Sequence, residues 1–139
     1  MNFVSVRIIT GDIVRLVDFY ERVTGVAADW STEDFAEIRT ASATLAIGST
    51  RTVPLFSPGS AGPADNRSVI LEFLVDDVDG VHANLAGVVE EFVKEPTTMP
   101  WGNRSLLFRD PDGNLVNLFT PVTPAAVAKF ARRGRVVSG

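Results

Sequence analysis

Residues 100–121 read PWGNRSLLFRDPDGNLVNLFTP, which is typical of a strand, a tight turn and a second strand. Pro111 fixes its own φ near the value that turn residues need, and Gly113 can adopt the positive φ that closes a hairpin. The runs on either side of the turn have the apolar composition of strands. A single amide, Asn117, interrupts the second run. We therefore predict a β-hairpin that carries one polar side chain within an apolar strand.

The chain has 139 residues, which suits one domain or two small repeated halves. No Cys is present, and this excludes disulfides, thiolate catalysis and zinc sites built from Cys. No apolar run approaches the roughly 20 residues of a membrane span, and no signal peptide opens the sequence. We therefore expect a cytoplasmic protein that does not associate with a membrane.

The net charge is −4, and the residues from 129 onward carry four basic side chains and no acidic one. The rest of the chain is therefore more acidic than the total suggests. An acidic surface disfavours nucleic acid and favours cationic or neutral ligands. We expect a small-molecule partner and no nucleic acid.

An internal repeat organises the sequence. Residues 3–10 predict a strand, and Asp12 can cap a helix that follows it. Residues 13–24 predict that helix, because their apolar residues recur at helical spacing. At an offset of 65 residues Asp12 falls on Asp77, which again lies between a predicted strand and a predicted helix. Three short strands follow each helix. In the second half we expect a strand at residues 68–75, a helix at 78–87 that ends at Gly87, and a further strand at 89–93.

This order predicts an α+β fold, in which two βαβββ repeats form a curved mixed sheet around a concave cleft with the helices outside. The modules span 1–56 and 68–121. A linker rich in Pro, Gly and Ser joins them at 57–67, and a helix and basic tail occupy 122–139. We expect one structural domain overall. Alternation in the strand after the linker places Ile70, Glu72 and Leu74 toward the cleft.

Three motifs resemble one known family. The hairpin run PWGNRSLLFRDPDGNLVNLF is similar to the C-terminal signature of the vicinal oxygen chelate superfamily, which includes glyoxalases, bleomycin-resistance proteins and extradiol dioxygenases. LVDFYERVTG resembles the first-helix motif of that family, and LVDDVDGV resembles the second. The resemblance covers roughly residues 3–120.

The resemblance implies a divalent metal on the concave face, with two ligands from each half, usually His and Glu. Those positions fall here on Ser5, Ala46, Ile70 and Asn117. None is an ordinary ligand for a divalent metal, because Ile and Ala offer no donor atom. We therefore expect no metal and no other cofactor.

Other polar residues are candidates for the cleft. Arg7 and Glu72 occupy equivalent places in the repeat, where they would orient a ligand or form a structural ion pair. Glu72 could also act as a general base if it is desolvated. Asn117 and Arg104 are further candidates for hydrogen bonds to a ligand. His82, the only histidine, lies on the second helix, where we expect it to be packed rather than functional.

Four aromatic residues are candidates for the wall or rim of the cleft: Trp30, Phe35, Trp101 and Phe119. Trp101 is the strongest of these, because Pro100 and Gly102 place it in a loop.

The residues allow three functions. The first, which we favour, is a metal-independent, drug-sequestering binding protein like the bleomycin-resistance branch, expected to be a homodimer with a cationic or aromatic ligand. The second is a lyase, isomerase or dioxygenase that uses an atypical metal site, built from Glu37, Glu72 or Asn117, or metal-free acid–base chemistry. The third is a non-catalytic interaction module.

Overall fold

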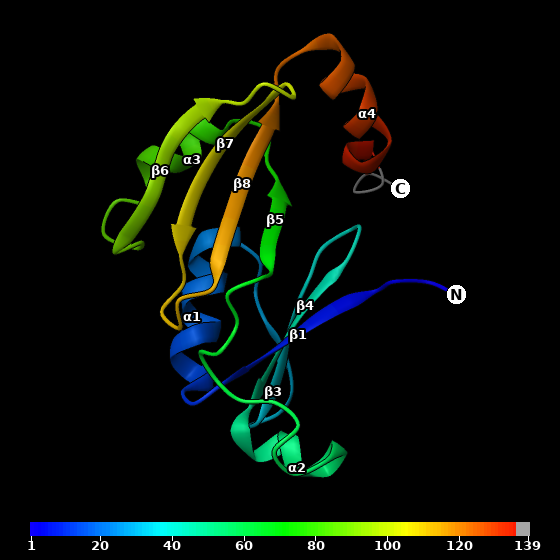
Figure 1. The fold of residues 1–139 in the computed structure, drawn as a ribbon, viewed down its shortest axis with the longest axis vertical. Coiled ribbons are helices and arrows are strands. Elements are labelled where there is room, and N and C mark those ends of the chain that lie inside the picture. Colours follow the sequence, from blue (N-terminus) through cyan, green and yellow to red (C-terminus); the bar gives the residue numbers. More distant parts are fainter. Residues whose placement is uncertain (136–139) are drawn as a thin grey trace. The chain divides into compact units, whose positions relative to one another are not determined.

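The computed structural model describes residues 1–135, with side chains up to residue 131. The chain forms two compact units, which divide between Asn66 and Arg67. The first unit contains β1 (Ser5–Thr10), α1 (Ile13–Thr24), β2 (Asp29–Thr32), β3 (Phe35–Arg39), β4 (Thr44–Ser49), a 3₁₀ turn (Thr50–Thr52) and α2 (Val53–Phe56). The second contains β5 (Ile70–Leu74), α3 (Val78–Asn84), β6 (Glu91–Thr98), β7 (Asn103–Arg109), β8 (Leu115–Pro121) and α4 (Pro124–Arg135) (Figure 1).

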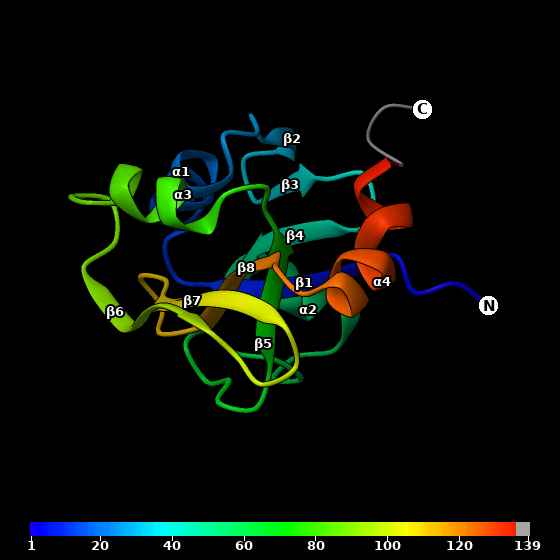
Figure 2. The same ribbon diagram turned by 90° about the horizontal axis from the view of Figure 1, so that it is seen from above.

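The two units share one topology. The first sheet has the order β1-β4-β3-β2 and the second β5-β8-β7-β6, so β4 lies between β1 and β3 (Figure 2) just as β8 lies between β5 and β7. In each sheet the first and last strands of the unit pair in parallel, and the other pairs are antiparallel. The predicted α+β fold with two βαβββ repeats is confirmed.

Both repeats begin their helix in the same way. The side chain of Asp12 accepts a hydrogen bond from the backbone N–H of Arg15 at 3.1 Å. Asp77 accepts from the N–H of Gly80 at 3.2 Å. These contacts satisfy N–H groups that have no partner within the helix. Gly25, with φ of 72°, ends α1 in the left-handed conformation that a side chain would disfavour.

The second half differs from the prediction between α3 and β7. The helix stops at Asn84, three residues before Gly87, because Leu85 begins a turn whose carbonyl accepts from Val88 and Val89. The strand predicted at 89–93 instead spans Glu91–Thr98. It includes Pro96, which has no N–H to donate, and the register shifts between Lys94 and Thr97 on this edge strand.

The β7–β8 hairpin forms as predicted around one carboxylate. Asp110 Oδ1 accepts from the backbone N–H groups of Asp112 and Asn114, both at 2.9 Å. Its Oδ2 accepts from Asn114 Nδ2 at 2.8 Å. Gly113 has φ of 85°, as the turn requires. Asp110 is 4% exposed, so these bonds satisfy a carboxylate that water barely reaches.

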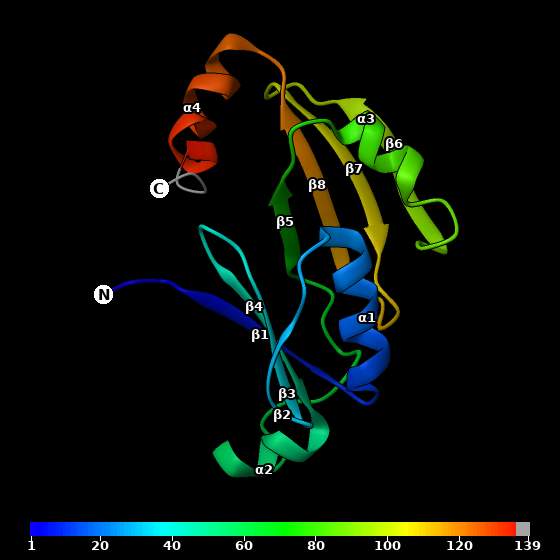
Figure 3. The same ribbon diagram turned by 180° about the vertical axis from the view of Figure 1, so that it is seen from behind.

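Each sheet has one face covered by the helix of its own unit and one that we call the open face. In the first unit α1 covers the face with Ala36, Ile38 and Ile47, all fully buried. In the second, α3 packs on β6, β7 and β8 from the side visible in Figure 3 and covers Leu106 and Phe108. Register and alternation assign the open faces. They carry Ser5, Arg7, Ile9, Phe35, Glu37, Arg39, Ala46 and Gly48 in the first unit, and Ile70, Glu72, Leu74, Asn103, Ser105, Leu107, Asn117 and Phe119 in the second.

No helix within residues 1–135 is long and apolar enough to cross a membrane.

Candidate ligand-binding site

A carboxylate–amide pair lies at the centre of the open face of the second unit. Glu72 on β5 and Asn117 on β8 are register partners, and Asn117 Nδ2 donates to Glu72 Oε2 at 2.8 Å. An ionised carboxylate only accepts hydrogen bonds, so this contact requires the amide nitrogen, not the oxygen, to face Glu72. Asn117 Oδ1 is therefore left as an acceptor for another partner.

Further polar atoms on the same face lack partners. Asn117 Oδ1, Asn103 Oδ1 and Ser105 Oγ are buried and have no hydrogen-bond partner among the described residues. Asp112 Oδ2, in the β7–β8 turn, is the only other such atom in that part of the chain. Each unpaired buried polar group costs about 1–3 kcal/mol. Three of them on one sheet face therefore indicate a surface suited to a hydrogen-bonding ligand.

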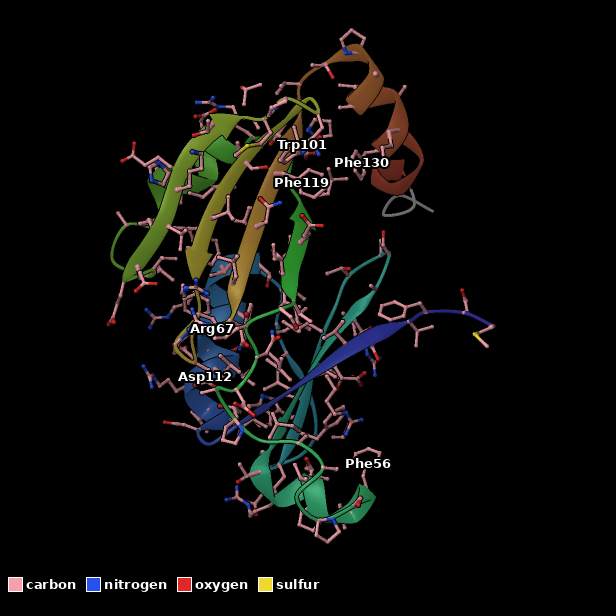
Figure 4. All side chains as sticks on the ribbon, in the orientation of Figure 1. Phe56, Arg67, Trp101, Asp112, Phe119 and Phe130 are labelled. Atoms are coloured by element: carbon pink, nitrogen blue, oxygen red, sulfur yellow. The ribbon has the colours of Figure 1, made fainter. Side chains whose placement is uncertain are left out.

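Apolar side chains surround these polar atoms. Phe119, next to Ser105 in the register, packs against Phe130 of α4 with ring centroids 5.0 Å apart. Figure 4 shows these two rings pointing toward one another. Ile70 and Leu74, on either side of Glu72, are 48% and 37% exposed. The face thus combines hydrogen-bonding atoms with apolar and aromatic surface, as small-molecule sites do.

Trp101 lies at the end of the sheet where α4 begins. It is 67% exposed in the turn between β6 and β7. Gly102, with φ of 96°, supplies a carbonyl that accepts from the N–H of Val122 at 2.9 Å, and a Cβ there would collide with Thr123 Oγ1. The turn is thereby fixed to the segment that leads into α4. Trp101 is an exposed aromatic side chain on an anchored loop.

Arg104 has a different place from the one expected. It lies on the face covered by α3, where Nε and Nη2 donate to Asp79 Oδ2 and Oδ1 at 2.8 and 3.0 Å. Hydrogen bonds from Arg104 hold the pKa of Asp79 below its ordinary value, and those to Asp79 raise the pKa of Arg104. Arg104 fastens α3 to β7 and does not reach the open face.

Trp30 is also displaced from the expected position. It pairs with Ala36, so its side chain is on the face covered by α1. The β2–β3 register shifts between Trp30 and Thr32, which the sequence did not reveal. Phe35, by contrast, is on the open face of the first unit.

Arg7 and Glu72 each find partners within their own unit. The guanidinium carbon of Arg7 lies 4.4 Å from the ring centroid of Phe35, whereas Glu72 accepts from Asn117. His82 is packed as predicted: its ring centroid is 5.0 Å from that of Phe92.

The four positions that correspond to metal ligands lack suitable donors. Ala46 is opposite Arg7 and Asn117 is opposite Glu72, so the two sheets place these residues equivalently. Ser5 and Asn117 each offer a neutral oxygen, but Ala46 and Ile70 offer nothing. No group of three His, Asp or Glu side chains in the described part of the chain is arranged to hold a metal ion. The residues present do not fit a divalent cation.

Sequence reasoning missed two contributors. Ser105 shares a face with Asn117 because β7 and β8 pair across the DPDG turn, so the hairpin register could have revealed it. Phe130 follows the buried Ala126 by four residues, a spacing that marks one face of the C-terminal helix.

Comparison with solved structures supports the fold. A family enzyme from Burkholderia phytofirmans PsJN, titled glyoxalase/bleomycin resistance protein/dioxygenase, has a TM-score of 0.76 at 20% identity, covering 85% of this chain and 97% of that one. A protein of unknown function from Agrobacterium tumefaciens str. C58 has a TM-score of 0.75 at 27% identity, and the match covers 88% of this chain and 95% of that one. A glyoxalase/bleomycin resistance protein/dioxygenase from Nocardioides has a TM-score of 0.72 at 20% identity, and the match covers 89% of this chain and 85% of that one. The likenesses at 20% identity establish the fold alone.

The search among curated proteins found no significant match. The family model described as Glyoxalase/Bleomycin resistance protein/Dioxygenase superfamily matches residues 2–118, nearly the whole of the two repeats. With the paired βαβββ topology, this match shows that the chain belongs to the glyoxalase/bleomycin resistance protein/dioxygenase superfamily.

Proposed function

We propose that this protein binds a cationic small molecule with an apolar or aromatic body on the open face of its second sheet, without a metal ion. The observation that carries the proposal is the set of acceptors around Asn117. Glu72 is an exposed carboxylate, and the carbonyl oxygens of Asn117 and Asn103 are buried without partners among the described residues. A ligand that brings ammonium or amide N–H groups would satisfy them.

The surrounding side chains support the apolar part of the ligand. The exposed Ile70 and Leu74 flank Glu72, and the Phe119–Phe130 pair lies further along β8. Aromatic and aliphatic surface beside a few fixed polar groups favours ligands with a ring and one charged end. Sequestration of a drug is the biological role that we propose for such binding, because the family includes bleomycin resistance proteins.

The absence of metal participation is part of the proposal. It is supported by the donor chemistry of Ser5, Ala46, Ile70 and Asn117, which lacks imidazole and carboxylate. Recognition through hydrogen bonds and apolar contact would then proceed without a cation to polarise the ligand.

Binding is tested by calorimetric titration with benzylammonium, followed by bleomycin and a panel of cationic aromatic antibiotics. Benzyl alcohol serves as the neutral analogue. We expect benzylammonium to bind more tightly than benzyl alcohol, with the same affinity after treatment with EDTA. We expect Glu72→Gln to weaken benzylammonium binding by about tenfold, the loss of one charge-assisted hydrogen bond.

Glu90→Gln is the matched control, since it makes the same change at an exposed residue just before β6 and should leave binding unaltered. Equal affinities for the two probes, or equal effects of the two substitutions, would contradict the proposal. About one equivalent of bound metal in protein purified without chelator would overturn metal independence and favour an enzyme.

A further inference from the structure

Arg7 has unusual surroundings on the open face of the first unit. Its guanidinium carbon lies 4.4 Å from the ring centroid of Phe35 on β3 and 5.1 Å from that of Phe56. Phe56 is at the end of α2 (Figure 4). The residue opposite Arg7 on β4 is Ala46, and the next open-face residue of that strand is Gly48. The place that a Cβ on Gly48 would take is occupied by Thr52 Oγ1 and Ile9 Cδ1, whereas Arg7 itself is exposed.

Arg15 on α1 is exposed and has no carboxylate partner among the described residues, but the three other arginines of this unit besides Arg7 are engaged by carboxylates. Arg22 pairs with Asp18, Arg39 with Asp29 and Glu37, and Arg51 with Asp34, at distances between 2.6 and 3.1 Å.

Arg7 differs from them, because its guanidinium makes no hydrogen bond or ion pair with any described residue. Glu37, on the same face, is 22% exposed and accepts from Arg39 at 3.0 Å. The carboxylate most available to Arg7 on that face is therefore already occupied. Arg7 retains N–H donors that nothing in the first unit satisfies.

The aromatic contacts leave those donors accessible. Rings interact with the face of a guanidinium, whereas its five N–H groups point outward in the guanidinium plane. Two ring contacts also restrict the long side chain, which reduces the conformational entropy that a ligand must remove. Arg7 is thus held ready for an acceptor with two oxygens.

We infer that Arg7, Phe35 and Phe56 form a binding site for a small carboxylate that carries a planar apolar body. The carboxylate would accept a pair of N–H bonds from Arg7, the geometry that a guanidinium offers to two oxygens. The body would pack on Phe56, which is 71% exposed, and on its neighbour Leu55, which is 84% exposed. Its ligand would carry the opposite charge to the one that we propose for the second unit.

The test follows the Nε–Hε resonance of Arg7 by NMR in the full chain, during titration with benzoate, acetate and benzamide. We expect benzoate to shift the resonance to saturation. Acetate, which lacks the ring, should bind at least about threefold more weakly, and benzamide, which lacks the charge, should leave the resonance unmoved. A response to benzamide as large as that to benzoate would overturn the inference.

Substitutions separate the contribution of the paired N–H donors of Arg7 from the contribution of its positive charge. Arg7→Lys keeps the charge but loses the paired donors, so benzoate affinity should fall by about tenfold. Arg22→Lys is the control, because Arg22 lies on α1 and pairs with Asp18; it should change nothing. Phe56→Leu, at an exposed position, should weaken benzoate and spare acetate. Unchanged benzoate binding in Arg7→Lys, with folding verified by circular dichroism, would overturn the site.

Discussion

Ser105 and Ser49 show how two buried serines can have opposite energetic roles. Ser49 is 3% exposed, and its hydroxyl donates to Asp34 Oδ1 at 2.8 Å and accepts from the N–H of Arg51 at 3.2 Å. Ser105 is 2% exposed and its hydroxyl has no partner among the described residues. A buried hydroxyl without a partner has lost its water and gained nothing, so it destabilises the unbound protein. We attribute this arrangement at Ser105 to ligand binding, since a ligand would supply the missing bond.

Ser105→Ala should therefore raise the free energy of unfolding, by up to about 1 kcal/mol, because the unpaired hydroxyl disappears with little change in packing. Ser49→Ala should lower it by about 1–2 kcal/mol, because Asp34 and the Arg51 N–H lose a partner. Urea denaturation of the two variants measures both effects. An equal loss of stability in both would show that Ser105 is satisfied in solution. Ser105→Ala should also weaken benzylammonium binding.

At the scale of elements, much of the architecture could be predicted from local signals. Asp12 and Asp77 each cap a helix, and the Asp110 turn joins β7 to β8, because these short-range hydrogen bonds depend on a few neighbouring residues. Alternation also assigned Glu72 to the open face. These features need no knowledge of distant partners.

Other features depend on register, which local patterns do not encode. Trp30 lies on the α1 face because it pairs with Ala36, and a pairing displaced by one residue would have placed it on the opposite face. Arg104 belongs to the face of Leu106 and Phe108, and only the position of Asp79 on α3 reveals its role. The sequence thus indicated Glu72, Asn117 and Phe119 on the open face, but it did not indicate Ser105 or Phe130, and it misplaced Arg104.

The Asp79–Arg104 pair leads to a prediction about pH. Hydrogen bonds from Arg104 are the main reason why the pKa of Asp79 in the folded protein lies below its ordinary value of 3.8. Its contribution to stability is present above pH 3.8 and is lost as the pH falls through the lowered folded value. Asp79→Asn should therefore be slightly less stable than the parent at pH 7. The difference should vanish in acid below that pKa.

Chemical denaturation across this pH range measures the difference in unfolding free energy between the parent and Asp79→Asn. Arg104→Gln provides the comparison, because it removes the same pair from the other side and should show the same convergence in acid. A difference between the parent and Asp79→Asn that stays constant down to the acid limit would mean that the ion pair does not stabilise α3 on β7.

At the scale of the whole molecule, charge and fold act together. The chain has a net charge of −4, with basic residues concentrated from Lys129 onward. The two repeats keep the same topology but differ in what their open faces offer, since one presents Arg7 with unpaired donors and the other presents Glu72 with unpaired acceptors. The same βαβββ topology therefore presents an arginine in one repeat and a carboxylate in the other at equivalent positions of the sheet.

The acidic surface should also make binding of a cation depend on ionic strength. An excess of negative charge attracts benzylammonium over a distance that salt shortens, from about 30 Å at 0.01 M to about 10 Å at 0.1 M. We therefore expect its affinity to fall several-fold when NaCl is raised from about 0.01 M to about 0.3 M. Benzyl alcohol should show no such fall, because it carries no charge. Calorimetric titration at several salt concentrations measures both. If benzylammonium affinity is independent of salt while Glu72→Gln still weakens it, then recognition is confined to contacts on the open face and the acidic surface plays no part in attracting the ligand.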